Sequence, residues 1–290
     1  MSKLVLVETP RDAFQGLLRS IPTAEKVDFI RNLLDAGCRH VDFGSFVSPR
    51  AVPQMADSLD VWNGVRRPGV EFIAIIANER GLDRAIDAGG ISTVGFPFSI
   101  ADTFQRHNTN RGIDETWPVV ARLVERCGQN NLGFILYLSM AFGNPDGDPW
   151  DLDGLLEFIE RLTGMGVGIV SLADTIGTAT ANKVRRVFDL TIKRFDLLEL
   201  GAHFHSRYDG WSENIQAAYT SGCRRFDSAV GGLGGCPFAQ DQLVGNIPTE
   251  KLVEWLEARG EATGINRLLL AQCGQRASQL AGRYGDLRRS

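Results

Sequence analysis

Alternation between strand-like and helix-like segments is the feature that most restricts the fold of this 290-residue chain. The run at 70–77 is rich in β-branched residues and is typical of a parallel strand buried on both faces. Residues 22–37 repeat apolar side chains at helical spacing and stop at Gly37, which predicts a helix ending there. The other predicted strands lie at 3–8, 40–44, 92–96, 133–138, 168–172, 197–205 and 225–228. The other predicted helices lie at 53–64, 80–88, 113–128, 151–163, 180–194 and 210–221, from 250 onward, and at 264–283.

Eight such alternations, roughly 25–35 residues apart, predict an α/β fold with a single (β/α)8 TIM barrel. No linker-like stretch interrupts them, so residues 1–290 are expected to form one catalytic domain, with 264–283 as an additional C-terminal helix. A doubly wound open sheet is the alternative. It usually has fewer repeats and carries a Gly-x-Gly-x-x-Gly motif after its first strand, which this chain lacks.

The composition argues against several classes of protein. A formal net charge of −4 disfavours nucleic-acid binding, which favours a basic surface. No apolar run approaches the roughly 18 residues that span a bilayer, and residues 1–8 predict a first strand rather than a signal peptide. The five cysteines are odd in number and widely spaced, which indicates reduced thiols and a cytoplasmic location. We therefore expect no nucleic-acid or membrane partner.

Polar residues recur where the predicted strands end, which is where a barrel of this kind carries its chemistry. They are Arg11, Asp12, Asp42, Ser45, Ser139, Asp174, Thr175, His203, His205, Asp227 and Ser228. Any one of them is equally compatible with a helix N-cap. Their recurrence at most of the strand ends favours an active site.

His203 and His205 are the clearest metal-binding signal in this set. On a strand, side chains two apart share a face, so both imidazoles can converge on one point while Phe204 points away. Two imidazoles at a strand end form half of a metal site. The pair alone is weak evidence, because most such pairs are simply packed or solvated, so its meaning depends on partners elsewhere in the chain.

Several short motifs together resemble those of a known family. They are Pro-Arg-Asp-Ala-Phe-Gln-Gly at 10–16, Ser-Phe-Val-Ser-Pro-Arg at 45–50, Val-Pro-Gln-Met at 52–55, Asp-Thr-Ile-Gly at 174–177, His-Phe-His at 203–205, Gly-Leu-Gly-Gly-Cys-Pro at 232–237 and Gly-Asn at 245–246. Over nearly its whole length the chain resembles the 3-hydroxy-3-methylglutaryl-CoA lyase family, within the metal-dependent barrels that include isopropylmalate and homocitrate synthases. The Arg-Asp and His-x-His motifs belong to the wider superfamily, whereas the stretch at 45–49 and the turn at 234–237 are specific to the lyases.

The resemblance implies a metal site made of Asp12, His203, His205 and Asn246. One carboxylate, one amide oxygen and two imidazoles neutralise a divalent cation only partly and leave positions for substrate oxygens. Because the set has no thiolate, Mg²⁺ or Mn²⁺ is expected, with Zn²⁺ as the alternative. Taken alone, Asn246 would be interpreted as a loop or cap residue.

The activity implied by the resemblance is cleavage of 3-hydroxy-3-methylglutaryl-CoA to acetoacetate and acetyl-CoA, a step of leucine degradation. Asp174 or His203 would take part in removing the 3-hydroxyl proton, and the sequence does not decide between them. Arg11 would stabilise negative charge on the thioester oxygen. Cys236, in a glycine-rich turn that can close over the substrate, would protonate the enolate. The alternative for Cys236 is simple packing in a tight loop.

Seven residues are candidates for binding the acyl-CoA substrate: Arg11, Ser45, Ser48, Arg106, Asn108, Ser139 and Thr175. Ser45 and Ser48 offer hydroxyl groups to a substrate carboxylate. Arg106 and Asn108 follow the fourth strand and could meet the CoA phosphates, although a solvated loop is the alternative interpretation of that segment.

Three departures from the family pattern bear on the substrate. Asp42 stands where the family usually has Glu, so this catalytic candidate would reach Arg11 or the metal's bound water differently. Ser206 stands where Asp is common, and the segment 141–150 replaces a shorter loop. We expect these changes to surround the acyl pocket rather than the metal.

Three alternative functions fit parts of this pattern. One is a lyase for another 3-hydroxyacyl-CoA, such as a citramalyl-CoA-like thioester. Another is a synthase that performs a Claisen condensation of an acyl-CoA with a 2-oxo acid, although an acid such as Cys236 suits the lyase direction. The third is a non-catalytic binding protein, which the retained set of ligands, Arg11 and Cys236 disfavours. A homodimer is expected from the general behaviour of such barrels.

Overall fold

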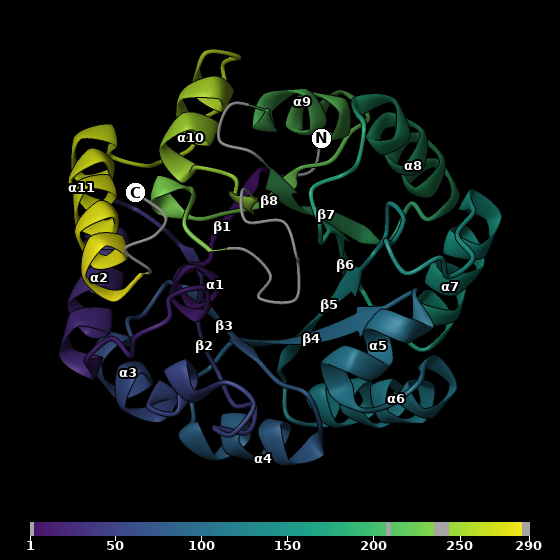
Figure 1. Ribbon diagram of the computed structural model, residues 1–290, viewed down its shortest axis with the longest axis horizontal. Helices are drawn as coiled ribbons and strands as arrows, with labels where there is room; N and C mark the ends of the chain where they lie inside the picture. The colour runs from purple at the N-terminus through teal and green to yellow at the C-terminus, as the bar shows by residue number, and fades with distance from the viewer. Residues whose placement is uncertain (1–2, 207–209, 235–243, 286–290) are drawn as a thin grey trace.

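Eight parallel strands close into a barrel at the centre of the molecule (Figure 1). The computed structural model describes residues 3–206, 210–234 and 244–285. The barrel strands are β1 (Val5–Glu8), β2 (His40–Ser45), β3 (Glu71–Ile75), β4 (Thr93–Ser99), β5 (Gly133–Ser139), β6 (Ile169–Asp174), β7 (Glu199–Ser206) and β8 (Arg225–Ser228). Each strand pairs with the next in the chain, and β8 pairs with β1 to close the ring. The prediction of a TIM barrel is confirmed.

Helices surround the strands, most of them in an outer ring (Figure 1). They are α1 (Pro10–Gln15), α2 (Thr23–Asp35), α3 (Ser58–Val65), α4 (Glu79–Ala88), α5 (Asp102–Thr109), α6 (Ile113–Gln129), α7 (Leu152–Gly164), α8 (Ala181–Arg194), α9 (Trp211–Thr220), α10 (Thr249–Glu257) and α11 (Arg267–Tyr284), with short 3-10 turns η1 (Pro53–Met55) and η2 (Val230–Gly232). The predicted C-terminal helix is α11, which packs on α2, where Glu25 accepts hydrogen bonds from Arg283 and Tyr284. None of the helices in the described ranges is long and apolar enough to cross a membrane.

The sequence analysis did not predict three elements, and all three border the mouth of the barrel. Helices α1 and α5 have 6 and 8 residues, too few for apolar periodicity to identify them. The third is β9 (Gly245–Asn246), a two-residue strand that pairs antiparallel with the end of β7, with His205 opposite Asn246.

Alternation along the strands divides the core into two layers. Inward-facing residues of β1, β3 and β5, among them Ile75 and Tyr137, form a cluster inside the barrel. Outward-facing residues pack under the helices, as Phe204 does against Phe142 and Phe188. Because successive strand residues face opposite layers, side chains two apart on β7 open into the barrel while the residue between them anchors the strand.

Candidate active site and metal centre

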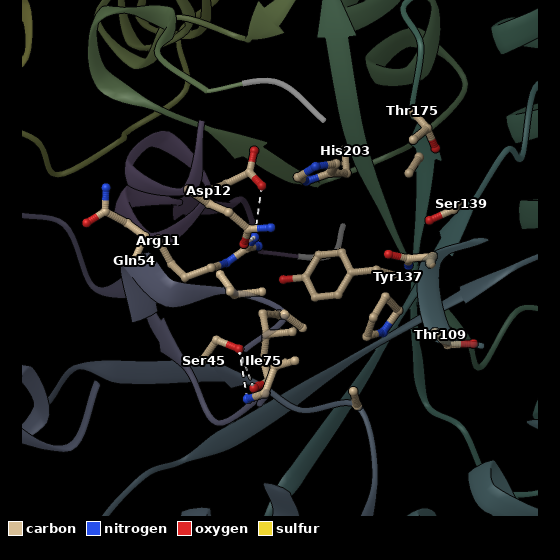
Figure 2. A pocket seen from close by; sticks show the side chains of 18 of the residues that line it. Arg11, Asp12, Ser45, Gln54, Ile75, Thr109, Tyr137, Ser139, Thr175 and His203 are labelled. Atoms are coloured by element: carbon tan, nitrogen blue, oxygen red, sulfur yellow. Dashed lines mark hydrogen bonds and ion pairs between the residues drawn. The ribbon is translucent and has the colours of Figure 1, made fainter. Parts of the chain in front are cut away.

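A cavity of about 460 Å³ opens at the carboxyl ends of the strands. Its walls come from α1 and the turn after it, from the loops that follow β2 and β4, and from inward residues of β3, β5, β6 and β7. Figure 2 shows Arg11, Asp12, Tyr137, Ser139 and His203 pointing toward this space. The chemistry therefore lies at the end of the barrel where strand-end residues predicted it.

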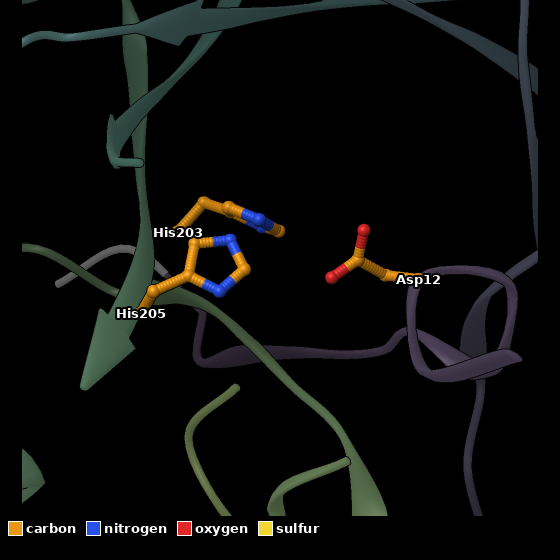
Figure 3. Close-up of side chains that lie close together, drawn as sticks. All are labelled: Asp12, His203 and His205. Carbon is orange, nitrogen blue, oxygen red and sulfur yellow. The ribbon is translucent and has the colours of Figure 1, made fainter. Parts of the chain in front are cut away.

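Asp12, His203 and His205 converge at one side of the cavity (Figure 3). Their candidate ligand atoms all lie within 4.8 Å of one another. Asp12 is in the first turn of α1, which Pro10 initiates, and the two histidines are on the inward face of β7. The geometry expected of the His-x-His pair is thus present, with Phe204 buried on the opposite face at 1% exposure.

Asn246 joins this group through its amide. Its Nδ2 donates to Asp12 Oδ2 at 2.7 Å and to the Leu233 carbonyl at 2.8 Å, which leaves Oδ1 available to a cation. The antiparallel pairing of Asn246 with His205 fixes its position along β7. All four residues implied as ligands by the family resemblance are therefore brought together.

Gly234 makes this close approach feasible. Its φ is +102°, and a Cβ there would collide with the Asn246 amide and with the backbone of Asp12 and Ala13. Gly234 is the last described residue before Cys236, which lies outside the described part of the chain. The predicted closure of the turn over the substrate also concerns residues outside that part.

The electrostatics of the group fit a divalent cation. Burial opposes ionisation of Asp12, but the charge of Arg11, the two histidines and the hydrogen bond from Asn246 hold its pKa well below its usual range. Burial, together with the neighbouring His203, lowers the pKa of His205 to about 4, which keeps its imidazole neutral. The buried Nδ1 of His205 has no hydrogen-bond partner in the described residues. An ionised carboxylate, a neutral imidazole with an unused nitrogen and a free amide oxygen suit Mg²⁺ or Mn²⁺.

Arg11 lies beside the metal cluster with its guanidinium fixed from two sides. Its Nε and Nη2 donate to Asp42 Oδ2 at 3.0 and 2.6 Å, and its Nη1 donates to Asp12 Oδ1 at 2.9 Å. Burial raises the pKa of Asp42 to about 6, although Arg11 partly opposes this. The sequence analysis considered two partners for Asp42, namely Arg11 and the metal's bound water. Asp42 does not line the cavity, and its carboxylate contacts Arg11.

Asp174 does not face the cavity. On β6 the cavity is lined by Ala173, and by Thr175 just beyond the strand, whereas Asp174 points to the opposite side. Its carboxylate accepts the backbone N–H groups of Thr178 at 3.1 Å and Ala179 at 2.9 Å, and so stabilises the turn after the strand. The predicted role of Asp174 in proton transfer therefore has no support from the cavity, because side chains that alternate with Ala173 and Thr175 face away from it.

The predicted substrate-binding residues divide into two groups. Arg11, Ser45, Asn108, Ser139 and Thr175 all line the cavity.

Ser48 and Arg106 are not among the residues that line it, so the cavity gives no support to their predicted role in substrate binding. Ser48 is exposed in the loop after β2, and its Oγ accepts from Arg50 N. Arg106 lies on the outer side of α5, where it pairs with Asp102 and Glu115. The segment is the helix α5 rather than the alternative of a solvated loop, and the helix turns Arg106 away from Asn108.

The loop 141–150 also lies outside the cavity wall, contrary to expectation. Trp150 Nε1 donates to the Ala141 carbonyl, and Asp148 accepts from Thr103 N and Oγ1, so the loop is held against α5. The added length therefore supports the outer rim rather than the acyl pocket.

The sequence analysis missed Tyr137 and named Asp227 only as one of the polar residues at the strand ends. The Tyr137 hydroxyl is buried in the cavity wall with no hydrogen-bond partner in the described residues. Asp227 Oδ2 lies 3.0 Å from His203 Nδ1. Strand parity could have identified both, because Tyr137 precedes inward Ser139 by two and Asp227 occupies the same face of β8 as Arg225.

Comparisons with known proteins agree with the site. The family model described as HMGL-like matches residues 4–276. The 3-hydroxy-3-isohexenylglutaryl-CoA/hydroxy-methylglutaryl-CoA lyase of Pseudomonas aeruginosa is 34% identical over 289 residues, covering 99% of this chain and 95% of that protein. The crystal structure of the hydroxymethylglutaryl-CoA lyase from Pseudomonas aeruginosa superposes with a TM-score of 0.89 at 33% identity, covering 98% of this chain and 95% of that one. An HMG-CoA lyase from Acinetobacter baumannii, solved with coenzyme A and 3-methylmalate, gives 0.86 at 31% identity, covering 98% and 96%. The chain belongs to the HMGL-like family, the group of barrel enzymes that its sequence motifs resemble.

Proposed function

We propose that this protein is a divalent-metal-dependent lyase that cleaves 3-hydroxy-3-methylglutaryl-CoA to acetoacetate and acetyl-CoA. The observation that carries the proposal is the convergence of Asp12, His203 and His205 beside Arg11 at the mouth of the barrel. Relatives of about one-third identity that cover nearly the whole chain are named as lyases of this substrate, not as synthases.

Asp12, His203, His205 and Asn246 would hold the ion, with Mg²⁺ or Mn²⁺ favoured by the oxygen and imidazole donors. When bound, the ion would lower the pKa of the substrate's 3-hydroxyl group and orient the substrate. Arg11 keeps its fork rigid through Asp42, so its charge is preorganised where negative charge develops on the thioester oxygen.

Of the two candidates for taking part in removal of the hydroxyl proton, His203 is supported because it lines the cavity and Asp174 does not. His203 would take part as a ligand of the ion that lowers the pKa of the hydroxyl group, since Asp227 Oδ2 lies 3.0 Å from its Nδ1 and leaves Nε2 for the cluster. We retain Cys236 as the proposed acid that protonates the enolate, since it follows Gly234, which lies against Asn246 and Asp12, by two residues in the sequence.

The substrate's free carboxylate would be held by neutral donors. Ser45, Ser139, Thr175 and Asn108 line the cavity, and the unpartnered Tyr137 hydroxyl adds another donor to the same space. A volume of about 460 Å³ is in the range of small-ligand sites and is adequate for an acyl group with part of its pantetheine arm.

A second candidate substrate is a 3-hydroxyglutaryl-CoA with a larger apolar branch at carbon 3. The cavity wall includes Val47, Ile75, Pro97 and Phe104, which would favour an apolar substituent. The Pseudomonas aeruginosa relative is named for both an isohexenyl and a methyl substrate.

The proposal also includes a homodimer and a cytoplasmic location with a role in leucine degradation. The four cysteines in the described residues are buried free thiols, which supports a reducing compartment. Sedimentation equilibrium of the purified protein would measure the oligomeric state.

One assay tests the main proposal. The purified protein is incubated with Mg²⁺ and a panel of 3-hydroxyacyl-CoAs, including the methyl and longer-branched glutaryl thioesters, and acetyl-CoA release is measured with and without EDTA. We expect cleavage that EDTA abolishes and that added Mg²⁺ or Mn²⁺ restores. Cleavage of no member of the panel, or cleavage indifferent to EDTA, would contradict the metallolyase assignment.

A further inference from the structure

Asp227 is a buried carboxylate directly behind one of the candidate metal ligands. It is 2% exposed and projects from β8 into the barrel. Its Oδ2 lies 3.0 Å from His203 Nδ1 and accepts a hydrogen bond from Ser171 Oγ at 3.1 Å. Asp227 is not among the residues that line the cavity, so it acts through His203 rather than on a bound substrate.

The contact determines which nitrogen of His203 can bind a cation. A neutral imidazole carries its hydrogen on one nitrogen and a lone pair on the other. A carboxylate at Nδ1 favours the hydrogen there, which leaves the lone pair on Nε2. The cluster with Asp12 and His205 then receives the lone pair of His203 without any rotation of the ring.

Neighbouring residues in the barrel interior hold Asp227 in place. Arg225 is two residues earlier on the same face of β8 and is 3% exposed. Its Nη1 donates to Glu199 Oε1 at 3.0 Å, and against the effect of burial the charges of Asp227 and Glu199 raise the pKa of Arg225, so a positive charge lies near the Asp227 carboxylate. Gly201 on β7 makes room for the arrangement, because a Cβ there would lie 2.9 Å from Ser171 Oγ and 3.2 Å from Arg225 Cδ.

We propose that Asp227 is the positioning residue of the metal centre: it fixes the tautomer and ring orientation of His203 so that Nε2 faces the cation. The inference rests on the proposed metal site and adds to it a residue outside the ligand set. It predicts that removal of the Asp227 carboxylate weakens metal binding even though no ligand is lost.

The chain contains a matched control for this experiment. His40 Nδ1 lies 2.9 Å from Glu71 Oε2, the same kind of histidine–carboxylate contact between neighbouring strands, but His40 is not part of the metal cluster. Binding of Mn²⁺ is measured by isothermal titration calorimetry and electron paramagnetic resonance for wild type, Asp227→Ala, Asp227→Asn and Glu71→Gln. We expect about 10- to 100-fold weaker binding for both Asp227 variants and unchanged binding for Glu71→Gln. Asp227→Asn weakens binding because an amide can donate to Nδ1 and favour the wrong tautomer.

A second measurement reads the tautomer directly. The chain has four histidines, so long-range ¹H–¹⁵N spectra of ¹⁵N-histidine-labelled, Mg²⁺-saturated protein resolve each ring. We expect the wild-type His203 to carry its hydrogen on Nδ1 and the variants to lose this preference. Mn²⁺ binding within two-fold of wild type by both folded Asp227 variants, with an unchanged His203 spectrum, would overturn the inference. Failure of the wild-type protein itself to bind Mn²⁺ would instead overturn the proposed metal site.

Discussion

Glu8 gives the folded protein a pH-dependent stability that one substitution should remove. The residue ends β1 at 2% exposure, where its Oε1 accepts Val230 N at 2.8 Å and its Oε2 lies 2.5 Å from Thr249 Oγ1. Burial raises the pKa of Glu8 from 4.5 to about 8, and the two hydrogen bonds oppose this effect only in part. The folded protein therefore keeps a proton on Glu8 at neutral pH that the unfolded chain has released.

The sign and size of the effect follow from these two pKa values. Below pH 4.5 the carboxyl is neutral in both states, so its stabilising influence is complete. As the pH rises from 4.5 to about 8, the folded state binds more protons than the unfolded state, and the free energy of unfolding falls. At 1.36 kcal/mol per pKa unit, the total loss is about 5 kcal/mol by pH 9.

Glu8→Gln should abolish this loss. The amide reproduces the neutral carboxyl, because its oxygen can accept from Val230 N and its NH₂ can donate to Thr249 Oγ1, which in turn donates to Ser228 Oγ at 2.9 Å. Urea unfolding at pH 5, 7 and 9 would measure the difference in the free energy of unfolding between variant and wild type. The contributions of the other titrating groups are the same in both proteins and cancel in this difference. We expect a difference of about 1 kcal/mol at pH 5 that grows to about 5 kcal/mol in favour of the variant at pH 9. Glu157→Gln, at an exposed position, is the control. A Glu8→Gln difference that stays constant with pH would refute the reasoning.

Three further substitutions test the site and its support. Arg11→Lys keeps the charge but loses the fork to Asp42, so kcat/KM in the acetyl-CoA release assay should fall by about 10²–10³ while Mn²⁺ still binds; a fall below five-fold would argue against the rigid fork. Phe204→Ala removes a side chain at 1% exposure and should lower the free energy of unfolding in urea by about 3–5 kcal/mol, whereas a loss under 1 kcal/mol would mean that β7 is not anchored there. Cys236→Ala should lower turnover by about 10²–10⁴ with folding and metal content unchanged, and wild-type turnover would remove this thiol from the mechanism.

The fold was predictable because strand-like and helix-like segments alternate regularly along the sequence. Eight apolar runs with helical segments between them admit few topologies, and each boundary needs to be correct only to within a few residues. The helices α1 and α5 were not predicted because one or two turns are too short to show a helical period of apolar residues. Strand β9 escaped because two residues carry no pattern at all, although they place Asn246 against β7.

The site was predictable where strand parity was applied, and less so elsewhere. Parity correctly separated His203 and His205 from Phe204 on β7. The same rule on β6 assigns Asp174 to the helix side, since Ala173 and Thr175 line the cavity. Ser48 and Arg106 could not be placed in this way, because a loop and a short helix have no fixed relation to the barrel interior. The contact between Asp227 and His203 depends on the pairing of β7 with β8 and on its register. The sequence alone does not define this register.

The bond between Asn246 and Asp12 joins residues 234 apart in sequence, across the seam where β8 meets β1. Contacts of such long separation form late, because the intervening chain must be ordered before their ends can meet. Almost the entire chain must therefore be synthesised before all four candidate ligands are present. Cation affinity would be acquired at the last stage of synthesis, and a chain truncated between β8 and Asn246 would lack part of the ligand set even though all eight barrel strands were present.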